Sequence, residues 1–188
     1  MNYLIFSTFL LLGGCTAALL PSSNQINESP WTTFEDGKAA FDRIIPNTTT
    51  TAELLELGFD PYTTPNVKLI TYLDLINKFL PNPAIRLENL DESVKSCLEA
   101  REGCYGYEIA PNRIKTKRYG NVFLDLLNFN RKTTTTGWRF SALIVMKNGV
   151  VVYKLWGGEP KILTLEEKNN PLGPLQEFDN VLTVPAFY

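Results

Sequence analysis

The sequence ALIVMKNGVVVYKLW (residues 142–156) determines how the second half of the chain folds. Two apolar runs rich in β-branched residues flank Lys147-Asn148-Gly149. An Asn-Gly pair between such runs is the strongest short-range signal of a β-hairpin. The charged interruption also leaves each run far shorter than the roughly 20 residues that span a bilayer. We therefore predict two antiparallel strands, residues 137–147 and 150–156.

The rest of the chain separates into helical patterns first and strand patterns afterwards. Thr50-Thr51-Ala52-Glu53 matches a capping box, and Gly58 is placed to end the helix that follows. Thr133–Thr136 with Gly137 is predicted to form a turn. This order indicates an α+β protein, with N-terminal helices packed on one face of a meandering antiparallel sheet of three to four strands. The predicted helices are residues 34–45, 50–58, 69–79 and 91–100, and the further strands are residues 104–118 and 121–131.

The chain begins with an apolar run, Tyr3 to Leu12, whose length suits an export signal better than a membrane-spanning helix. The following Leu12-Gly13-Gly14-Cys15 resembles a bacterial lipobox. The resemblance implies a diacylglycerol thioether on Cys15, cleavage after Gly14 and acylation of the new amine. An ordinary signal peptide is the alternative, since the first three residues lack Lys and Arg.

The export signal sets the predicted domain boundaries and location. We expect a lipoprotein signal peptide over residues 1–14, a flexible tether over 15–30 and one domain over 31–188, with an insertion at about 69–118. Thr16 replaces the aspartate that retains lipoproteins in the inner membrane, so we expect the periplasmic face of the outer membrane. Acylated Cys15 would then bind the membrane.

Two further cysteines, Cys97 and Cys104, lie in CLEAREGC. Seven helical steps would separate them by about 10.5 Å, whereas a disulfide needs roughly 7 Å or less between Cα atoms. The helix that carries Cys97 must therefore end before Cys104, and Gly103 can turn the chain there. Because exported proteins keep disulfides, we predict a structural bridge. A redox-active pair is the alternative, although it would prefer a CxxC spacing.

Composition excludes several classes of function. A net charge of −2 gives no electrostatic footprint for nucleic acid. The basic cluster Arg113, Lys115, Lys117 and Arg118 is interpreted as the solvated face of a strand, with phosphate or lipid-headgroup binding as the alternative. The chain contains no histidine, which removes Ser-His and Cys-His nucleophile pairs and the commonest zinc ligand.

We therefore predict a protein that is not an enzyme, with no catalytic residues, metal or cofactor. Asp125 in FLDLLNF is the one acidic residue inside an apolar strand pattern. Period-two alternation would turn it outward, opposite Leu124 and Leu126. A hydrolase using paired carboxylates is the enzymatic alternative.

Aromatic residues mark the candidate binding surface. Trp138, Phe140, Tyr153 and Trp156 come from paired strands and are interpreted as core, with a partner-binding patch as the alternative. An exposed recognition surface is expected where a strand ends and where the tail is rich in Pro and Gly. Its predicted residues are Trp156, Gly157, Gly158, Pro171, Leu172, Gly173 and Pro174.

Two stretches carry a family resemblance. Residues 45–61 and the hairpin of residues 138–156 are similar to the turn-helix-Leu-Gly-x-Pro segment and the last two strands of small outer-membrane lipoproteins of the BamE (SmpA/OmlA) type. GWRFSALIV, YKLWGGEP and NPLGPLQ also resemble uncharacterised proteobacterial envelope lipoproteins.

The resemblance implies helices packed on a three-stranded sheet and a role in outer-membrane protein assembly or envelope integrity. We expect a non-catalytic binding or scaffold subunit with a protein partner in the cell envelope and no nucleic-acid partner. A periplasmic module that binds a ligand or acts as an inhibitor is the alternative.

Overall fold

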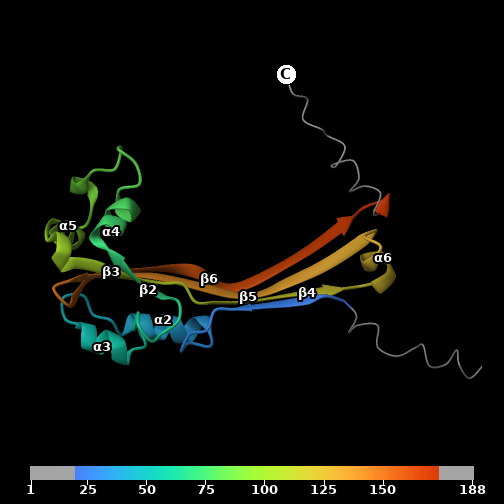
Figure 1. Ribbon diagram of the computed structural model, residues 1–188, viewed down its shortest axis with the longest axis horizontal. Coiled ribbons are helices and arrows are strands. Elements are labelled where there is room, and N and C mark those ends of the chain that lie inside the picture. Colours follow the sequence, from blue (N-terminus) through green and yellow to red (C-terminus); the bar gives the residue numbers. More distant parts are fainter. Residues whose placement is uncertain (1–19, 174–188) are drawn as a thin grey trace, which may run out of the picture. The chain divides into compact units, whose positions relative to one another are not determined.

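The computed structural model describes residues 20–173, which form a six-stranded antiparallel sheet with helices around it (Figure 1). The predicted signal segment and Cys15 lie outside the described residues, as does Pro174. The strands are β1 (Ser22–Ile26), β2 (Val67–Thr71), β3 (Cys104–Ile109), β4 (Asn112–Tyr119), β5 (Asn130–Lys147) and β6 (Val150–Asn169). The α-helices are α2 (Phe34–Asp42), α3 (Thr51–Glu56), α4 (Tyr72–Phe79), α5 (Glu92–Glu99) and α6 (Val122–Leu126), and the short 3-10 helices are η3 (Leu87–Asn89) and η4 (Arg101–Gly103).

Strand β5 is the centre of the sheet. The strand order is β1-β4-β5-β3-β2, and β6 also pairs with β5. The register of β3 against β5 runs from Cys104 opposite Lys147 to Ile109 opposite Ala142. Strand β4 continues along the same edge of β5, since the Phe140 amide donates to the Pro111 carbonyl at 3.1 Å. The predicted strand 104–118 is thus two strands, because proline offers no N–H to the ladder.

The chain forms two compact units, which we call the large unit and the small unit. The large unit consists of residues 25–114 and 137–162. The described part of the small unit consists of residues 20–24, 115–136 and 163–173. Strands β1, β4, β5 and β6 contribute residues to both units, whereas helices α2 to α5 belong to the large unit and α6 to the small one.

In the large unit, helices cover both faces of the sheet (Figure 1). Helices α2 and α3 enclose one core with Phe140 and Ile144 of β5, while α4 and α5 enclose a second core with Val145. The predicted fold class is therefore wrong in two respects. The sheet has six strands among the described residues, and the helices alternate with strands along the chain and do not precede them all. The sequence pattern missed β2 and β1, whose pairing with distant strands no local pattern reveals.

Threonine caps set the starts of three helices. Helices α2, α3 and α4 each begin with a capping box, in which a threonine hydroxyl accepts from the N3 amide and the N3 carboxylate accepts from the cap amide. The box predicted at Thr50 and Glu53 is confirmed, and Gly58 has the left-handed φ of 91° expected of a helix stop. Helix α4 starts at Tyr72 and not at residue 69, because Thr71 caps it and residues 67–71 pair with β3. Hydrogen bonds from the Thr71 amide and hydroxyl lower the pKa of Asp74.

The hairpin prediction is confirmed, although its strands are longer than expected. Asn148 and Gly149 have φ values of 50° and 83°, as a two-residue primed turn requires. Strand β5 already begins at Asn130, so the threonines predicted as a turn lie within it, and β6 continues to Asn169. Consecutive β-branched residues suit a strand at least as well as a turn. Residues 22–26 of the predicted tether form β1, which pairs with β4.

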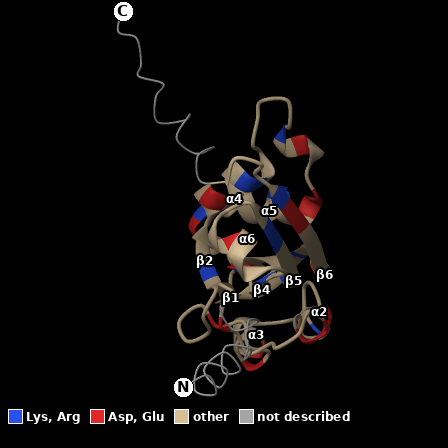
Figure 2. Ribbon diagram, turned by 90° about the vertical axis from the view of Figure 1, so that its right-hand side faces the viewer, with Lys and Arg blue, Asp and Glu red and all other residues tan. Residues whose placement is uncertain are grey.

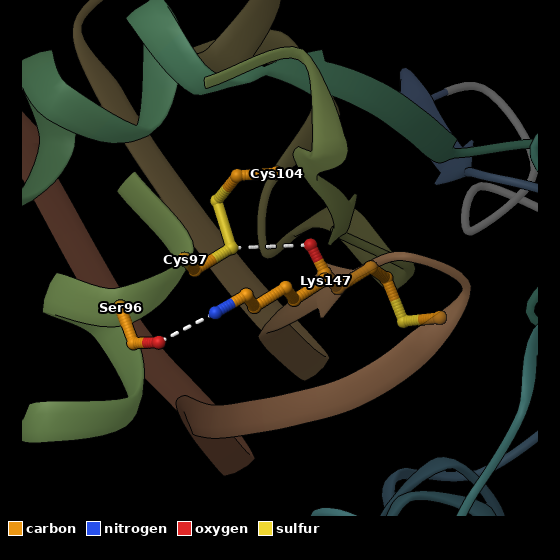
Figure 3. Close-up of a disulfide and its surroundings, with 5 residues drawn as sticks. Ser96, Cys97, Cys104 and Lys147 are labelled. Atoms are coloured by element: carbon orange, nitrogen blue, oxygen red, sulfur yellow. Dashed lines mark hydrogen bonds between the residues drawn. A yellow bond between two sulfur atoms is a disulfide. The ribbon is translucent and has the colours of Figure 1, made fainter. Parts of the chain in front are cut away.

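The predicted disulfide is present. Cys97 of α5 and Cys104 at the start of β3 are bridged with a Cα–Cα distance of 5.1 Å (Figure 3). Helix α5 ends at Glu99 and η4 turns the chain, as the geometric argument required. Next to the bridge, Lys147 Nζ donates to Ser96 Oγ at 2.6 Å, which joins the end of β5 to α5. The disulfide therefore ties α5 to the sheet beside the hairpin.

Reducing this disulfide should destabilise the protein. Closing so short a loop restricts the unfolded chain, so we expect its loss to lower the free energy of unfolding by about 2.5 kcal/mol. Urea unfolding followed by circular dichroism, with and without reductant, measures the change. A Cys97→Ala, Cys104→Ala chain serves as control, since reductant should leave its midpoint unchanged. Equal midpoints for the oxidised and reduced native chain would contradict the expectation.

Candidate docking surfaces

The small unit exposes a helix where the sequence pattern predicted a strand. Helix α6 interrupts the predicted strand 121–131, and the Asn121 side chain caps it by accepting from the amides of Phe123 and Leu124 at 2.9 and 3.2 Å. A short apolar run fits either a strand or a helix, and the asparagine cap decides here. The exposed apolar residues of this segment, which we call the α6 patch, are Phe123, Leu124, Leu126 and Leu127.

Asp125 faces the interior of the small unit. Its side chain is 4% exposed, and Oδ1 lies 3.2 Å from Arg118 Nη1. The predicted outward orientation is therefore wrong, because helical periodicity replaces strand alternation at this position. Phe123 and Leu126 are consequently the residues that point out, with 73% and 77% of their surface exposed. The pairing of the buried Asp125 carboxylate with the partly exposed Arg118 thus fixes which side of α6 faces solvent.

The polar groups around Asp125 line a small cavity of about 180 Å³. Asp125 Oδ2 and Arg131 Nε are buried there without a hydrogen-bond partner. The cavity is lined by Leu20, Pro21, Arg118, Val122, Asp125, Leu126 and Arg131.

Three residues of the predicted recognition surface lie at the end of α6. Asn170 is buried, and its amide and side chain donate to the carbonyls of Phe129 and Asn128 at 2.8 and 3.0 Å. These bonds fix Pro171, Leu172 and Gly173, of which Pro171 and Leu172 are exposed and Gly173 is buried. At Gly173 a Cβ atom would lie 2.7 Å from the Phe129 ring, so a glycine is needed for this close approach.

Trp156 belongs to the large unit and lies half in its core. The indole stacks on Phe140 with ring centroids 6.3 Å apart and meets Phe34 edge-on at 6.0 Å, yet 43% of it is exposed. Lys38 Nζ lies 4.8 Å from the ring centroid, in a cation–π contact. Phe140 is fully buried, as predicted for the aromatic cluster, whereas Trp156 presents part of its ring to solvent. The residue can therefore serve both packing and recognition.

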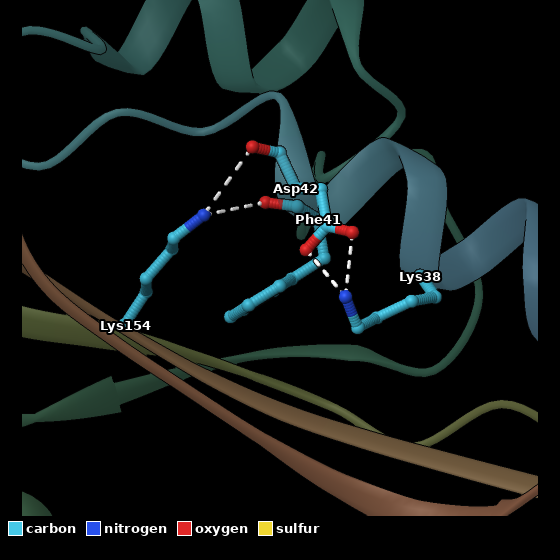
Figure 4. Close-up of polar contacts among 4 residues, drawn as sticks. All are labelled: Lys38, Phe41, Asp42 and Lys154. Carbon is cyan, nitrogen blue, oxygen red and sulfur yellow. Dashed lines mark hydrogen bonds and ion pairs between the residues drawn. The ribbon is translucent and has the colours of Figure 1, made fainter.

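Next to Trp156, two lysines hold α2 against β6 (Figure 4). Lys154 Nζ donates to the Phe41 carbonyl at 3.0 Å and lies over the Phe41 ring. Lys38 pairs with Asp42 at 2.6 Å. Burial lowers the pKa of Lys154, while the Asp42 carboxylate acts in the opposite direction. The amine binds carbonyls at the end of a helix, where a positive charge is favourable.

Gly157 and Gly158 have different roles. Gly158 has φ of 141°, and a Cβ atom there would lie 2.2 Å from the Arg139 carbonyl oxygen of the neighbouring strand. At Gly157 the nearest atom to a Cβ would be Ser141 Oγ, at an ordinary 3.5 Å. Gly158 is therefore required by strand packing, whereas Gly157 is free to contact a partner.

Beside Gly157, a groove of about 310 Å³ opens on the face of the sheet that carries α4. Leu143 and Leu155 give it an apolar floor, and Lys78 pairs with Glu108 at 2.6 Å on its wall. Its lining also includes Ile109, Ala110, Ser141, Ala142, Trp156 and Gly157.

The two halves of the predicted recognition surface belong to different units. Trp156, Gly157 and Gly158 lie in the large unit, and Pro171, Leu172 and Gly173 lie in the small one. We therefore treat the α6 patch and the groove beside Trp156 as two separate surfaces. The sequence pattern predicted a strand over residues 121–131, so the α6 patch was not anticipated.

Comparison with known proteins assigns no function to these surfaces, and the described residues contain no metal site or membrane-spanning helix. No protein-family model, curated protein or solved structure matches the chain. Within residues 20–173, no group of three His, Cys, Asp or Glu side chains is placed to hold a metal ion. Every helix in that range is too short or too polar to span a bilayer. The resemblance to BamE-type lipoproteins stays a prediction.

Substituting the two glycines separates their roles. We expect Gly158→Ala to lower the free energy of unfolding by about 2–3 kcal/mol, because the added Cβ meets backbone and φ is unfavourable for alanine. Gly157→Ala, the matched control, should stay close to the parent protein. Chemical denaturation of both variants measures the difference, and equal stabilities would disprove the assignment.

Proposed function

We propose that the protein is a non-catalytic, lipid-anchored subunit of the cell envelope that binds an extended segment of a partner protein along the outer edge of β6. The observation that carries the proposal is a long sheet edge that no other described strand covers. Strand β6 pairs only with β5, and across residues 152–162 its other edge has no strand partner within residues 20–173. An uncovered edge offers its N–H and C=O groups to an incoming strand.

The chain itself shows how this edge binds an extended segment. At the hairpin end, Val151 donates to the Thr49 carbonyl at 2.9 Å and accepts from the Asn47 amide at 2.6 Å. Thr50 forms an isolated antiparallel bridge with Val150. The loop before α3 thus already occupies the first positions of the edge. A partner strand would continue this pairing along the residues that follow Val151.

The groove supports side-chain recognition next to that edge. A strand that extends a sheet directs alternate side chains to one face, so pockets on that face read its sequence. Leu155 and Gly157 of β6 line such a pocket, with Leu143 of β5 as its floor. Leu155 and Trp156 are both about half exposed, which leaves apolar surface for a partner to bury.

A charged residue and a proline limit which strands can pair with the outer edge of β6. Glu159 pairs with Arg139 at 3.2 Å, and Pro160 cannot donate a backbone hydrogen bond. Both features are devices that limit edge-to-edge aggregation. The segment between Val151 and Glu159 is therefore the part of the edge that we assign to the partner.

A small-ligand module is the second candidate, because the groove volume of about 310 Å³ reaches the lower end of the range for ligand sites. A carboxylate-based hydrolase has less support. The cavity next to Asp125 is lined by two arginines and no second acid, whereas glycoside hydrolysis uses a pair of carboxyl groups.

A negative charge introduced at the groove should weaken partner binding. Leu155→Asp places a carboxylate where the partner would bury apolar surface, so we expect about tenfold less partner protein on affinity capture from detergent-solubilised envelopes. Leu73→Asp is the matched control, because Leu73 of α4 is equally accessible and lies outside the groove lining. Quantitative mass spectrometry of the captured proteins provides the measurement.

Two outcomes would contradict the proposal. One is an equal effect of Leu155→Asp and Leu73→Asp on the amount of each captured protein. The other is a small molecule released from the purified native chain and lost on Leu155→Asp with no protein lost, which would favour the ligand module.

A further inference from the structure

The small unit combines exposed apolar side chains with positive charge. Its described residues include six basic and three acidic side chains, a net charge of +3, although the whole chain carries −2. The α6 patch lies in this unit and presents Phe123 and Leu126 almost fully to solvent. Figure 2, with α6 toward the viewer, shows a helix that carries mostly uncharged residues. Exposed apolar surface in a unit of net positive charge is the composition of a membrane-surface contact.

The orientation of the α6 patch is built into the fold. Asp125 is the only charged residue of α6, and its pairing with Arg118 directs it inward. A globular helix ordinarily buries its apolar side and exposes its charges. Here the arrangement is reversed: the charge is buried and the large apolar residues face out. Such a reversal is stable when the apolar side has an apolar medium to enter.

Two lysines in the same unit lack acidic partners. Lys115 and Lys117 of β4 line a groove of about 350 Å³ with Thr134 and Thr136 of β5 and with Tyr119. No ion pair among the described residues involves either lysine. Because side chains alternate along β4, both lysines leave the face of the sheet opposite Arg118, which pairs with Asp125 of α6. Their amines therefore contribute to the positive charge of the unit, which attracts an anionic bilayer over about a Debye length.

The start of the described chain limits the distance between this unit and the predicted anchor. Leu20 and Pro21 line the cavity beside α6, and the Pro21 carbonyl accepts from the Arg118 amide at 3.3 Å. Cys15 precedes Leu20 by five residues, which span at most about 18 Å when fully extended. Acyl chains on Cys15 would therefore hold α6 close to the leaflet that contains them.

We propose that the α6 patch enters the headgroup region of the bilayer that holds the Cys15 acyl chains, with Phe123 and Leu126 as its buried residues and the positive charge of the small unit attracting anionic lipids. This second contact rests on the proposed lipid anchor. It gives the small unit a fixed orientation on the membrane. The anchor raises the effective concentration of the α6 contact, so a weak second contact is sufficient.

Vesicle binding without the anchor isolates this contact. The chain from residue 15 with Cys15→Ser retains every described residue and carries no acyl group. We expect it to sediment with vesicles of phosphatidylglycerol and phosphatidylcholine, more strongly at low salt. Phe123→Ser with Leu126→Ser should lower the partition coefficient about tenfold on all vesicles. Lys115→Gln with Lys117→Gln should lower it about tenfold on the anionic vesicles only.

Leu73→Ser is the matched control, because it removes an exposed leucine from the large unit and should leave sedimentation unchanged. Circular dichroism and disulfide content confirm that each variant folds. If the Cys15→Ser chain does not sediment with anionic vesicles, or if the Phe123, Leu126 variant sediments as its parent does, the inference is overturned. It is equally overturned if that variant keeps vesicle binding and loses a captured protein, since α6 would then dock a protein.

The mass of the N-terminal peptide of the native protein tests the anchor separately. An acylated Cys15 together with failed vesicle binding overturns the membrane contact alone. An unmodified amino terminus overturns the proposed anchor, and α6 would then not be held near a leaflet by acyl chains on Cys15.

Discussion

The whole fold depends on burying both faces of one strand. In the large unit, Phe140, Ile144 and Met146 of β5 enter the core under α2 and α3, while Val145 enters the core under α4 and α5. The same strand is hydrogen-bonded along both edges, by β6 on one side and by β3 and β4 on the other. A strand buried on two faces needs near-continuous apolar sequence, and SALIVM supplies it. Helices on both faces follow from this requirement, because each face of β5 must be covered.

The same long strands leave two surfaces uncovered. Because β6 pairs only with β5, its outer edge stays accessible beyond the loop that binds at Val151. In the small unit, β4 and β5 are joined by α6, whose buried Asp125 pairs with Arg118 and directs the apolar residues of the helix outward. In an isolated protein, an uncovered strand edge and an exposed apolar helix promote aggregation. In a protein held at a membrane beside its partner, the same surfaces can form binding sites.

Local sequence signals predicted the features that local chemistry controls. Asn148-Gly149 identified the hairpin, Thr50 and Glu53 identified a capping box, and the spacing of Cys97 and Cys104 identified the disulfide. The sequence could not indicate that β2 pairs with β3, because register depends on residues distant in the chain. At the candidate sites, Trp156 was recognised as an exposed aromatic residue, but α6 was assigned to a strand. The short apolar run fits both periodicities, and its asparagine cap was the signal that could have decided between them.

Hydrogen–deuterium exchange on the native protein tests the central claim most directly, by comparing detergent-solubilised protein with protein in intact envelope membranes. We expect residues 142–146 of β5 to exchange slowest in both states, because they are buried on two faces and bonded on two edges. Residues 152–159 of β6 and residues 122–127 should exchange measurably more slowly in membranes, if the proposed partner and the bilayer cover them. Identical exchange of these two segments in both states, or faster exchange in β5 than in α2, would contradict the account.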